Sequence, residues 1–415
     1  MPPRFGDNVI GGAEAALREA AEGLAERGWE VDVLTTCARD YITWADHYPE
    51  GEDDLGGVRV RRFRVDRTRD DARYSAATAR VLGAIACVEP GRFDPELVSR
   101  TTAAAAFAWL EEQGPFAPAL VEALRRRQSD FDALIFFSYR YWTTVQGLLA
   151  SERPSLLVPT AEDDGAYRLP IFPPVLRKAS ALVFNSAEER AMLEQAAGGP
   201  LPGEVVGVGS ELPARADGEA FRRRHHLDGP FLLYVGRIDR NKGCAELFDL
   251  FLRYRRESGS SLRLVLIGKA VLPVPDDPGL VPLGFLPDEE KWDALEASLG
   301  LVMPSWLESL SMVTLEAFWA RRPVLANARG DVLRGQCRRS NAGLYYATYD
   351  EFREALALLE GDAGLRETLG RNGRRYFETH YGWDVIERKY LELLARVVPV
   401  RPGRAVGVGP AALGA

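Results

Sequence analysis

The interpretation of this chain depends on one stretch, residues 303–316: Met303-Pro-Ser-Trp-Leu-Glu308-Ser-Leu-Ser-Met-Val-Thr-Leu-Glu316. An apolar strand over residues 299–303 is expected to end at Pro304, and an amphipathic helix is expected to begin between Ser309 and Ser311. In one interpretation Ser311 caps the helix and both Glu side chains are solvated. In the other, the turn aims free backbone N–H groups at an anion while the two carboxylates bind hydroxyls. The stretch alone favours neither.

Composition limits the classes of protein that fit. The chain has 415 residues, which predicts two domains. A net charge of −8 argues against nucleic acid as a partner. The four Cys have no metal-ligand spacing, and free thiols suggest a reducing compartment. The start has no apolar signal core, and no run approaches the ~20 apolar residues of a membrane span. We therefore expect a cytoplasmic protein without a metal, and leave open a peripheral contact at the inner face of the membrane.

The first half begins with a glycine pair. Gly11 and Gly12 precede an Ala-rich helix that is expected to end at Gly28, and a strand follows over residues 29–36. Two glycines at a helix start let a ligand approach the backbone closely. A plain tight turn explains the pair equally simply.

Two more expected strands of the first half end in polar or aromatic residues. Residues 131–137 form a buried-strand pattern, followed by Tyr139 and Tyr141, which form either a platform for a sugar ring or rim packing. Residues 155–159 form another strand, followed by Glu162 and Asp163. In open α/β sheets, ligands bind beyond the carboxyl ends of the strands.

A boundary rich in Gly and Pro, residues 198–230, separates the two halves. Strands alternate with helices in the second half, which predicts a parallel doubly wound sheet. Arg237 follows the first of these strands and Lys242 begins the next helix, so that two cations flank a turn that suits a diphosphate. Lys is scarce: it occurs at five positions, 178, 242, 269, 291 and 389.

Together these features resemble the retaining glycosyltransferases of family 4, which have the two-domain GT-B fold. Four residues separate Arg237 from Lys242 and seven separate Glu308 from Glu316, as in the motifs of that family. The glycine turn at residues 11–13 and a late amphipathic helix with Trp383, expected over residues 376–394, also match. The resemblance covers most of the chain.

The resemblance implies an α/β fold of two Rossmann-like doubly wound domains facing across a cleft. Residues 1–205 would be the acceptor-side domain and residues 206–375 the domain that binds the nucleotide sugar. A helix over residues 376–396 would cross back to the first domain, and residues 397–415 would be a disordered tail.

The resemblance also implies roles for individual residues. Arg237, Lys242 and Glu308 would be catalytic, the two cations holding the diphosphate and Glu308 the hydroxyls of the transferred sugar. Glu316 would bind the ribose. The remaining donor contacts would come from glycine turns, strand ends and helix amides: Gly12, Gly236, Gly268, Lys269, Phe285, Leu286, Leu310, Ser311 and Met312. The acceptor or sugar side would use Gly11, Tyr139, Tyr141, Glu162 and Asp163.

The implied activity is transfer of a sugar from a nucleoside-diphosphate sugar, of UDP or GDP type, to a glycan, a lipid-linked or a small-molecule acceptor, without a metal. Two departures from the family pattern stand out. Many members have a His after the strand that matches residues 156–159, where this chain has Glu162 and Asp163, and Ser309-Leu-Ser311 replaces a Gly-x-Gly. A sugar phosphorylase, a nucleotide-sugar epimerase and a non-catalytic glycosyltransferase-like subunit remain alternatives. The base, the sugar, the acceptor and the oligomeric state stay open.

Overall fold

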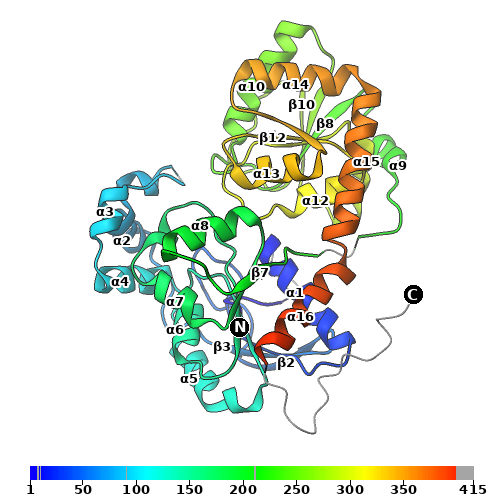
Figure 1. Ribbon diagram of the computed structural model, residues 1–415. Helices are drawn as coiled ribbons and strands as arrows, with labels where there is room; N and C mark the ends of the chain where they lie inside the picture. Colours follow the sequence, from blue (N-terminus) through cyan, green and yellow to red (C-terminus); the bar gives the residue numbers. More distant parts are fainter. Residues whose placement is uncertain (7–8, 10, 90, 210–211, 399–415) are drawn as a thin grey trace. The chain divides into compact units, whose positions relative to one another are not determined.

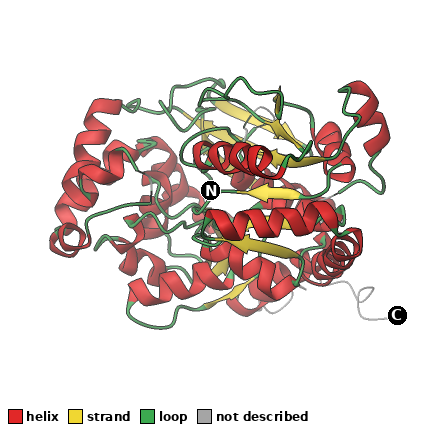
Figure 2. Cartoon of the chain, turned by 90° about the horizontal axis from the view of Figure 1, so that it is seen from above, coloured by secondary structure: helices red, strands yellow, loops and turns green. Residues whose placement is uncertain are grey.

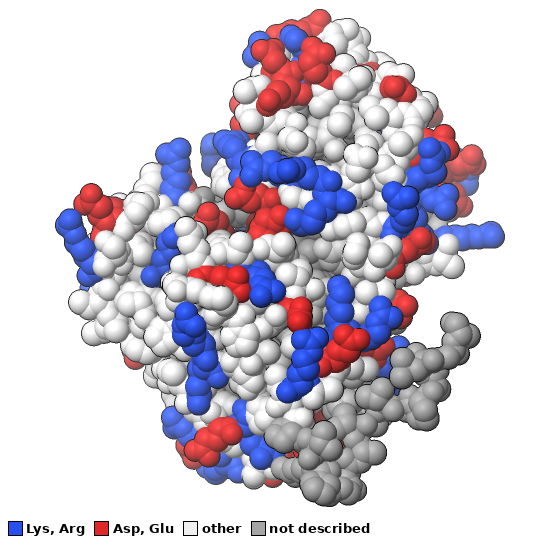
Figure 3. Space-filling model, viewed as in Figure 1, with Lys and Arg blue, Asp and Glu red and all other residues white. Residues whose placement is uncertain are grey.

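The computed structural model describes residues 1–6, 9, 11–89, 91–209 and 212–398 (Figure 1). The chain divides into two compact units, one formed by residues up to Gly207 and from Ile386 on, the other by Val208–Val385. Of the tail expected over residues 397–415, everything from residue 399 lies outside the described residues. On the face shown in Figure 3, Lys and Arg side chains are interspersed with Asp and Glu.

The second unit is built on six parallel strands. Their spatial order is β10-β9-β8-β11-β12-β13. The strands are β8 (Phe231–Val235), β9 (Arg263–Ile267), β10 (Leu280–Gly284), β11 (Leu301–Met303), β12 (Val324–Asn327) and β13 (Gly343–Tyr346). The helices are α9 (Gly218–Arg224), α10 (Cys244–Ser258), α11 (Asp288–Ala297), α12 (Met312–Trp319), α13 (Asp331–Ser340), α14 (Tyr349–Gly361) and α15 (Ala363–His380).

This order is the doubly wound arrangement that the alternation of strands and helices predicts. From β8 the chain first builds outward through β9 and β10, and then returns to add β11, β12 and β13 on the other side of β8. The connections therefore reverse direction between β8 and β11, and in such sheets ligands bind beyond the carboxyl ends of the strands at that point. Strand interiors such as Leu232, Leu264 and Val302 are fully buried, as expected for strands covered on both faces.

The first unit has a smaller and a larger sheet, ordered β1-β3-β2 and β4-β5-β6-β7, with β2 alone antiparallel to its neighbour among the described pairs. The strands are β1 (Asp32–Thr36), β2 (Gly51–Leu55), β3 (Val58–Phe63), β4 (Leu134–Phe137), β5 (Ser155–Val158), β6 (Ala181–Phe184) and β7 (Gly203–Val205). The helices are α1 (Gly12–Glu26), α2 (Asp71–Leu82), α3 (Pro95–Arg100), α4 (Ala103–Gln113), α5 (Pro118–Arg127), α6 (Trp142–Ala150), α7 (Phe172–Lys178) and α8 (Ala187–Ala197). Figure 2 distinguishes helices, strands and loops by colour.

The late helix expected over residues 376–394 is two helices, and that prediction was wrong. α15 ends at His380 and α16 (Trp383–Val397) begins after Gly382. Gly has a poor helix propensity, and the Gly382 N–H bonds to the carbonyl of Phe377, 3.1 Å away, instead of continuing the helix. α16 belongs to the first unit from Ile386 on.

Contacts of α16 hold it to the first unit. Lys389 Nζ donates to the carbonyl of Val206 at 3.1 Å, and Arg396 forms an ion pair with Glu204 at 2.7 Å. The chain thus returns to its first unit after completing the second.

Candidate active site

The turn after β8 is held by one carboxylate that sequence reasoning missed. Asp239 accepts a hydrogen bond from the Lys242 backbone N–H at 2.7 Å and forms an ion pair with the Arg237 guanidinium. The Tyr234 hydroxyl donates to the Arg237 carbonyl at 2.8 Å. These bonds fix the backbone between the two cations. The signal in the sequence was only an Asp between Arg237 and Lys242, a common feature of turns.

The turns after β8 and β11 pack directly against each other. Gly243 has a φ of 76°, and a Cβ atom there would lie 2.5 Å from the carbonyl oxygen of Pro304. Only Gly therefore fits both the backbone conformation and the space. Lys242, one residue earlier, places its Nζ 2.7 Å from Oε1 of Glu308 in the opposite turn. The second cation of one expected motif and the first carboxylate of the other are thus brought together.

The helix after β11 begins one residue later than expected. α12 starts at Met312, and Ser311 stands at its N-cap position with φ of 75°, a left-handed conformation that is uncommon for Ser. The Ser311 hydroxyl lies 2.9 Å from that of Thr314, and the Ser311 side chain makes no capping hydrogen bond to the first-turn amides. Ser311 is therefore not the hydrogen-bonding cap of the simple interpretation. The first-turn amides stay available for another acceptor.

Glu316 lies inside α12 and is nearly buried, with 6% exposure. Its Oε1 atom accepts from Lys291 Nζ of α11 at 2.7 Å. Its Oε2 atom is buried and has no hydrogen-bond partner among the described residues. Burial raises the pKa of Glu316, and the charge of Lys291 opposes this rise. A buried carboxylate oxygen without a partner suits a ligand hydroxyl.

Lys291 was not among the expected site residues. Burial disfavours its charged form, but Glu316 and Asp288 more than compensate and raise the pKa of the Lys291 amine. The scarcity of Lys in the chain was the one available signal. Nothing in the sequence indicated that α11 would turn this residue toward Glu316.

The ends of β8 and β9 approach each other closely. A Cβ atom on Gly268 would lie 2.0 Å from the carbonyl oxygen of Gly236. The two backbones can therefore approach this closely only because residue 268 has no side chain. Lys269 is exposed, and its carbonyl accepts from the Ile238 N–H at 3.0 Å. Near the end of β10, Phe285 is 67% exposed. An exposed aromatic ring at a strand end is suited to stack on a base.

Of the two tyrosines considered for an aromatic platform in the first unit, Tyr139 is buried and Tyr141 is half-buried. Tyr139 is 1% exposed and packs edge-on against Phe172, with 4.8 Å between ring centroids. It is therefore a core residue. Tyr141 is half-buried against Trp44, and burial raises its pKa to about 12.

The three carboxylates of the acidic stretch after β5 have different surroundings. Arg140 forms an ion pair with Asp164. Asp163 accepts from the Tyr167 hydroxyl at 2.7 Å, and Glu162 is half-buried. Asp164 thus forms the ion pair with Arg140, and the sequence did not indicate which of the three consecutive acids would do so.

Two left-handed residues end the adjacent strands β4 and β5. Ser138 has φ of 62° and Thr160 has φ of 52°, and their hydroxyl oxygens lie 2.8 Å apart. A β-branched residue in this conformation is strained, and such strain gathers at functional sites. At the start of α1, Glu14 forms an ion pair with Arg4, and a Cβ atom on Gly11 would meet the Glu14 carboxylate. Gly12 is exposed at the first position of the helix.

In the described part of the chain, no group of three or more His, Cys, Asp or Glu side chains is placed to hold a metal ion. None of the described helices is both long enough and apolar enough to cross a membrane.

Comparison with known proteins identifies both units. Residues 11–209 match the family described as "Glycosyl transferase 4-like domain", and residues 217–376 match "Glycosyl transferases group 1". The D-inositol 3-phosphate glycosyltransferase of Thermomonospora curvata is 26% identical over 449 residues, covering 98% of this chain and 95% of that protein.

Solved structures show the same fold. The sucrose-phosphate synthase of Thermosynechococcus elongatus has a TM-score of 0.66 at 18% identity, covering 93% of this chain and 94% of that chain. Anabaena HepE, solved in complex with UDP and glucose, has a TM-score of 0.64 at 16% identity, covering 95% and 98%. The predicted fold class is therefore confirmed, and this chain belongs to the family 4 type of GT-B glycosyltransferases.

Proposed function

We propose that the enzyme is a retaining glycosyltransferase that moves a sugar from a nucleoside-diphosphate sugar to an acceptor hydroxyl. One observation carries the proposal: Lys242 Nζ and Glu308 Oε1 lie 2.7 Å apart where the strand connections reverse direction, beside the first-turn amides of α12, which the Ser311 side chain does not cap. A cation, a carboxylate and free helix amides at one point match the groups of a sugar diphosphate.

The diphosphate would bind between Lys242, Arg237 and the first turn of α12. Lys242 is 30% exposed and Arg237 is 40% exposed, so both can reach a ligand. The N-terminus of a helix stabilises an anion through its unbonded N–H groups and its dipole. The amides of Leu310, Ser311 and Met312 are our candidates for these contacts.

The ribose would bind Glu316 and the base would lie near Phe285. The buried Oε2 of Glu316 has no partner among the described residues and would accept from a ribose hydroxyl. Lys291, bonded to Oε1, would keep the carboxylate charged and fixed. Gly268, Lys269 and Leu286, at the ends of β9 and β10, complete the proposed base site. Backbone and ring contacts of this kind suit either uracil or guanine.

The chemistry follows from where charge develops. When the bond between C1 of the sugar and the diphosphate oxygen breaks, negative charge grows on the diphosphate and positive charge spreads over the sugar ring. Cations and amides that are already in place stabilise the negative charge on the diphosphate. Groups fixed in advance around a developing charge make the largest electrostatic contribution to catalysis. The acceptor oxygen attacks C1 from the leaving-group face, and a diphosphate oxygen takes its proton. Glu308 would hold sugar hydroxyls, and no divalent metal is needed for charge balance.

Relatives and neighbours support these finer assignments. The curated relatives include D-inositol 3-phosphate glycosyltransferases, and HepE was solved with UDP and glucose. We therefore place a UDP-type donor first among candidates and a polyol, glycan or lipid-linked hydroxyl as the acceptor. Tyr141, Glu162 and the glycines at residues 11 and 12 remain our candidates for acceptor or sugar contacts.

Donor hydrolysis tests the proposal. The enzyme is incubated with UDP- and GDP-sugars, with and without excess chelator, and nucleoside diphosphate release is measured. We expect slow release without acceptor, acceleration by a hydroxyl acceptor, and no loss in chelator. Release that requires inorganic phosphate would indicate a phosphorylase. No release from any donor would indicate a non-catalytic subunit, and strict dependence on Mg²⁺ or Mn²⁺ would refute the metal-free mechanism.

A further inference from the structure

Two parallel strands of the first unit have edges without a partner strand. Within the described residues, β1 pairs with β3 alone and β4 with β5 alone. The Leu134 N–H donates to the carbonyl of Pro154 and the Ser138 N–H to the carbonyl of Val158, each at 2.9 Å. Both N–H groups therefore point toward β5. Because backbone groups alternate along a strand, Ile135 turns its N–H and C=O to the other edge.

β1 shows the same alternation. The Cys37 N–H bonds to the Phe63 carbonyl of β3 at 2.9 Å. Asp32 and Leu34 therefore turn their backbone groups away from β3. Buried backbone groups of this kind are normally paired, so an edge left open inside a unit calls for a partner.

A cavity of about 610 Å³ lies at these two edges. Residues 27–34 line it on one side and residues 130–137 on the other. Apolar side chains of α1 and α16 contribute further: Leu17, Ala21, Leu24, Tyr390 and Leu394. An unfilled space of this size costs the lining atoms their packing contacts.

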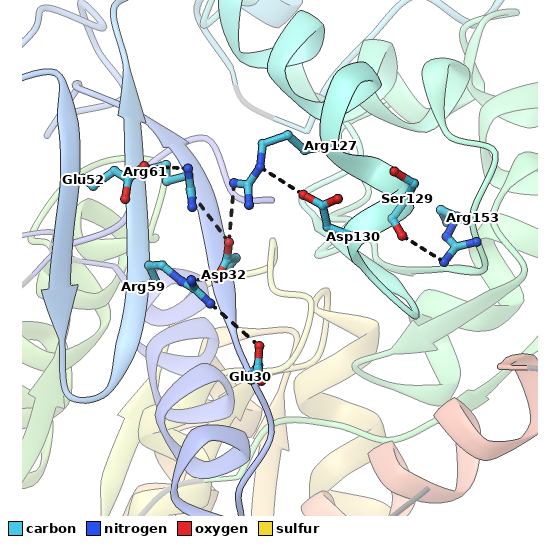
Figure 4. A network of polar contacts seen from close by, with 9 residues as sticks. All are labelled: Glu30, Asp32, Glu52, Arg59, Arg61, Arg127, Ser129, Asp130 and Arg153. Carbon is cyan, nitrogen blue, oxygen red and sulfur yellow. Dashed lines mark hydrogen bonds and ion pairs between the residues drawn. The ribbon is translucent and has the colours of Figure 1, made fainter. Parts of the chain in front are cut away.

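An ion-pair network connects the two sides at the beginning of the strands (Figure 4). Asp32 of β1 lies 2.6 Å from Arg59 Nε and 3.5 Å from Arg127 of α5. Arg127 also forms an ion pair at 3.2 Å with Asp130, the first residue of the stretch that lines the β4 side of the cavity. These ion pairs therefore fix the distance between the edges of β1 and β4.

The amine of Met1 lies in this cavity and donates to the carbonyl of Ile135. Burial lowers the pKa of this amine to about 5. A charged amine is costly there, whereas a peptide N–H at the same place would make an ordinary ladder bond of a parallel sheet.

The second unit shows what a complete sheet looks like. There β8, five residues long, lies between β9 and β11 and leads through a turn into α10, a helix of 15 residues, and then into β9. In the first unit α1, also of 15 residues, leads into β1. A helix that crosses between parallel strands starts from a strand beside its target.

We propose that the cavity receives a further parallel strand of about five residues, contributed by a segment of this chain directly preceding Met1. It pairs with β1 on one edge and β4 on the other and joins the two sheets into one. Its side chains are apolar on both faces, because α1 and α16 cover them. The strand leads into residues 1–6, which precede the glycine turn at residues 11 and 12 in the chain.

The test compares three proteins: the present chain, the chain with Val-Leu-Val-Ile-Val between an initiator Met and Met1, and a matched control with Val-Pro-Val-Pro-Val. Proline cannot donate in a sheet. We expect the first extension alone to raise Tm by about 5 °C or more. We expect it to slow hydrogen exchange of the Ile135 amide at least about tenfold. Equal Tm and equal exchange in both extended proteins would overturn the proposal.

Two further measurements guard against a non-specific effect. Ala21→Phe, which fills the cavity, is expected to remove at least half of the Tm gain in the extended protein; full retention of the gain would contradict insertion. The N-terminal peptide of the protein purified from its natural source is expected to begin upstream of Met1; a start at Met1 or Pro2 would refute the assignment to this chain. A fall in Tm on deleting residues 399–415, or a Tm that depends on protein concentration, would point to another occupant and also refute it.

Discussion

Replacing Lys291 by Met is expected to weaken both the fold and donor binding. Lys291 Nζ lies 2.7 Å from Glu316 Oε1, and the two side chains are 16% and 8% exposed. Met keeps most of the side-chain volume and removes the charge, so that the carboxylate is left buried without its partner. Breaking a buried pair costs about 3–5 kcal/mol. We expect the unfolding free energy to fall by about 3 kcal/mol, the lower end of this range, because Glu316 can become neutral by taking up a proton once Lys291 is gone.

The effect on catalysis follows from that proton. Burial already raises the pKa of Glu316, and only Lys291 opposes it substantially, so Lys291→Met raises this pKa further. A neutral carboxyl loses a charge-assisted hydrogen bond to the ribose, about 1.5–3 kcal/mol, or roughly 10- to 150-fold in kcat/KM. Activity of the variant is expected to recover as pH rises, because deprotonation restores the charged acceptor.

The assay uses donors that carry ribose or deoxyribose. The present enzyme is expected to prefer the ribose donor, and Lys291→Met and Glu316→Gln are expected to lose most of that preference. Lys178→Met, an exposed lysine at the end of α7, serves as the matched charge-removal control. If Lys291→Met keeps both the unfolding free energy and the donor preference of the parent enzyme, the pair has no role in ribose binding and the reasoning is refuted.

Three other predictions concern separate parts of the chain. Lys242→Met should lower kcat by about 10²–10³-fold in donor-hydrolysis assays, whereas Lys178→Met should not; equal rates would remove Lys242 from the site. Gly243→Ala should cost about 2–4 kcal/mol in urea unfolding because φ is 76° and its Cβ would lie 2.5 Å from a carbonyl oxygen. Gly259→Ala, with φ of 69° and no atom within 4 Å, should cost only about 1 kcal/mol; equal costs would contradict the packing argument. Burial raises the pKa of Glu189 from 4.5 to about 8, so the folded state holds a proton that the unfolded state has lost in this window. The unfolding free energy should therefore fall as pH rises from 4.5 to about 8, by at most about 1.4 kcal/mol per pH unit, and Glu189→Gln should make it less dependent on pH. An unchanged slope in the variant would show that Glu189 is not the source of the pH dependence.

Much of the second unit could be predicted because its signals are local. Glycines and prolines end the strands, apolar runs mark their interiors, and the alternation with helices sets the order of the sheet. The cations at residues 237 and 242 and the carboxylates at 308 and 316 were found in this way. Their convergence then follows from strand order, since β8 and β11 are neighbours.

What the sequence did not show depends on contacts between distant residues. Lys291 and Glu316 are 25 residues apart in the sequence and lie on different helices, and periodicity within either helix does not reveal their pairing. The same holds for Tyr139, whose place after a strand suggested an exposed ring but whose neighbour Phe172 comes from α7. The left-handed φ of 75° at Ser311 is a third case, because Ser has no local preference for that conformation.

The two carboxylates of the opening stretch are each held by a lysine, and the two pairs differ in what a ligand would change. Lys242 is the more exposed lysine, at 30% against 16%, and it lies beside the uncapped amides of α12. An incoming diphosphate would compete with Glu308 for its charge and free that carboxylate for the sugar hydroxyls. Lys291 has Glu316 and Asp288 as partners and need not move, because the unpaired Oε2 of Glu316 already offers a site. The first pair is thus suited to respond to the reacting groups, and the second to hold the part of the donor that does not react.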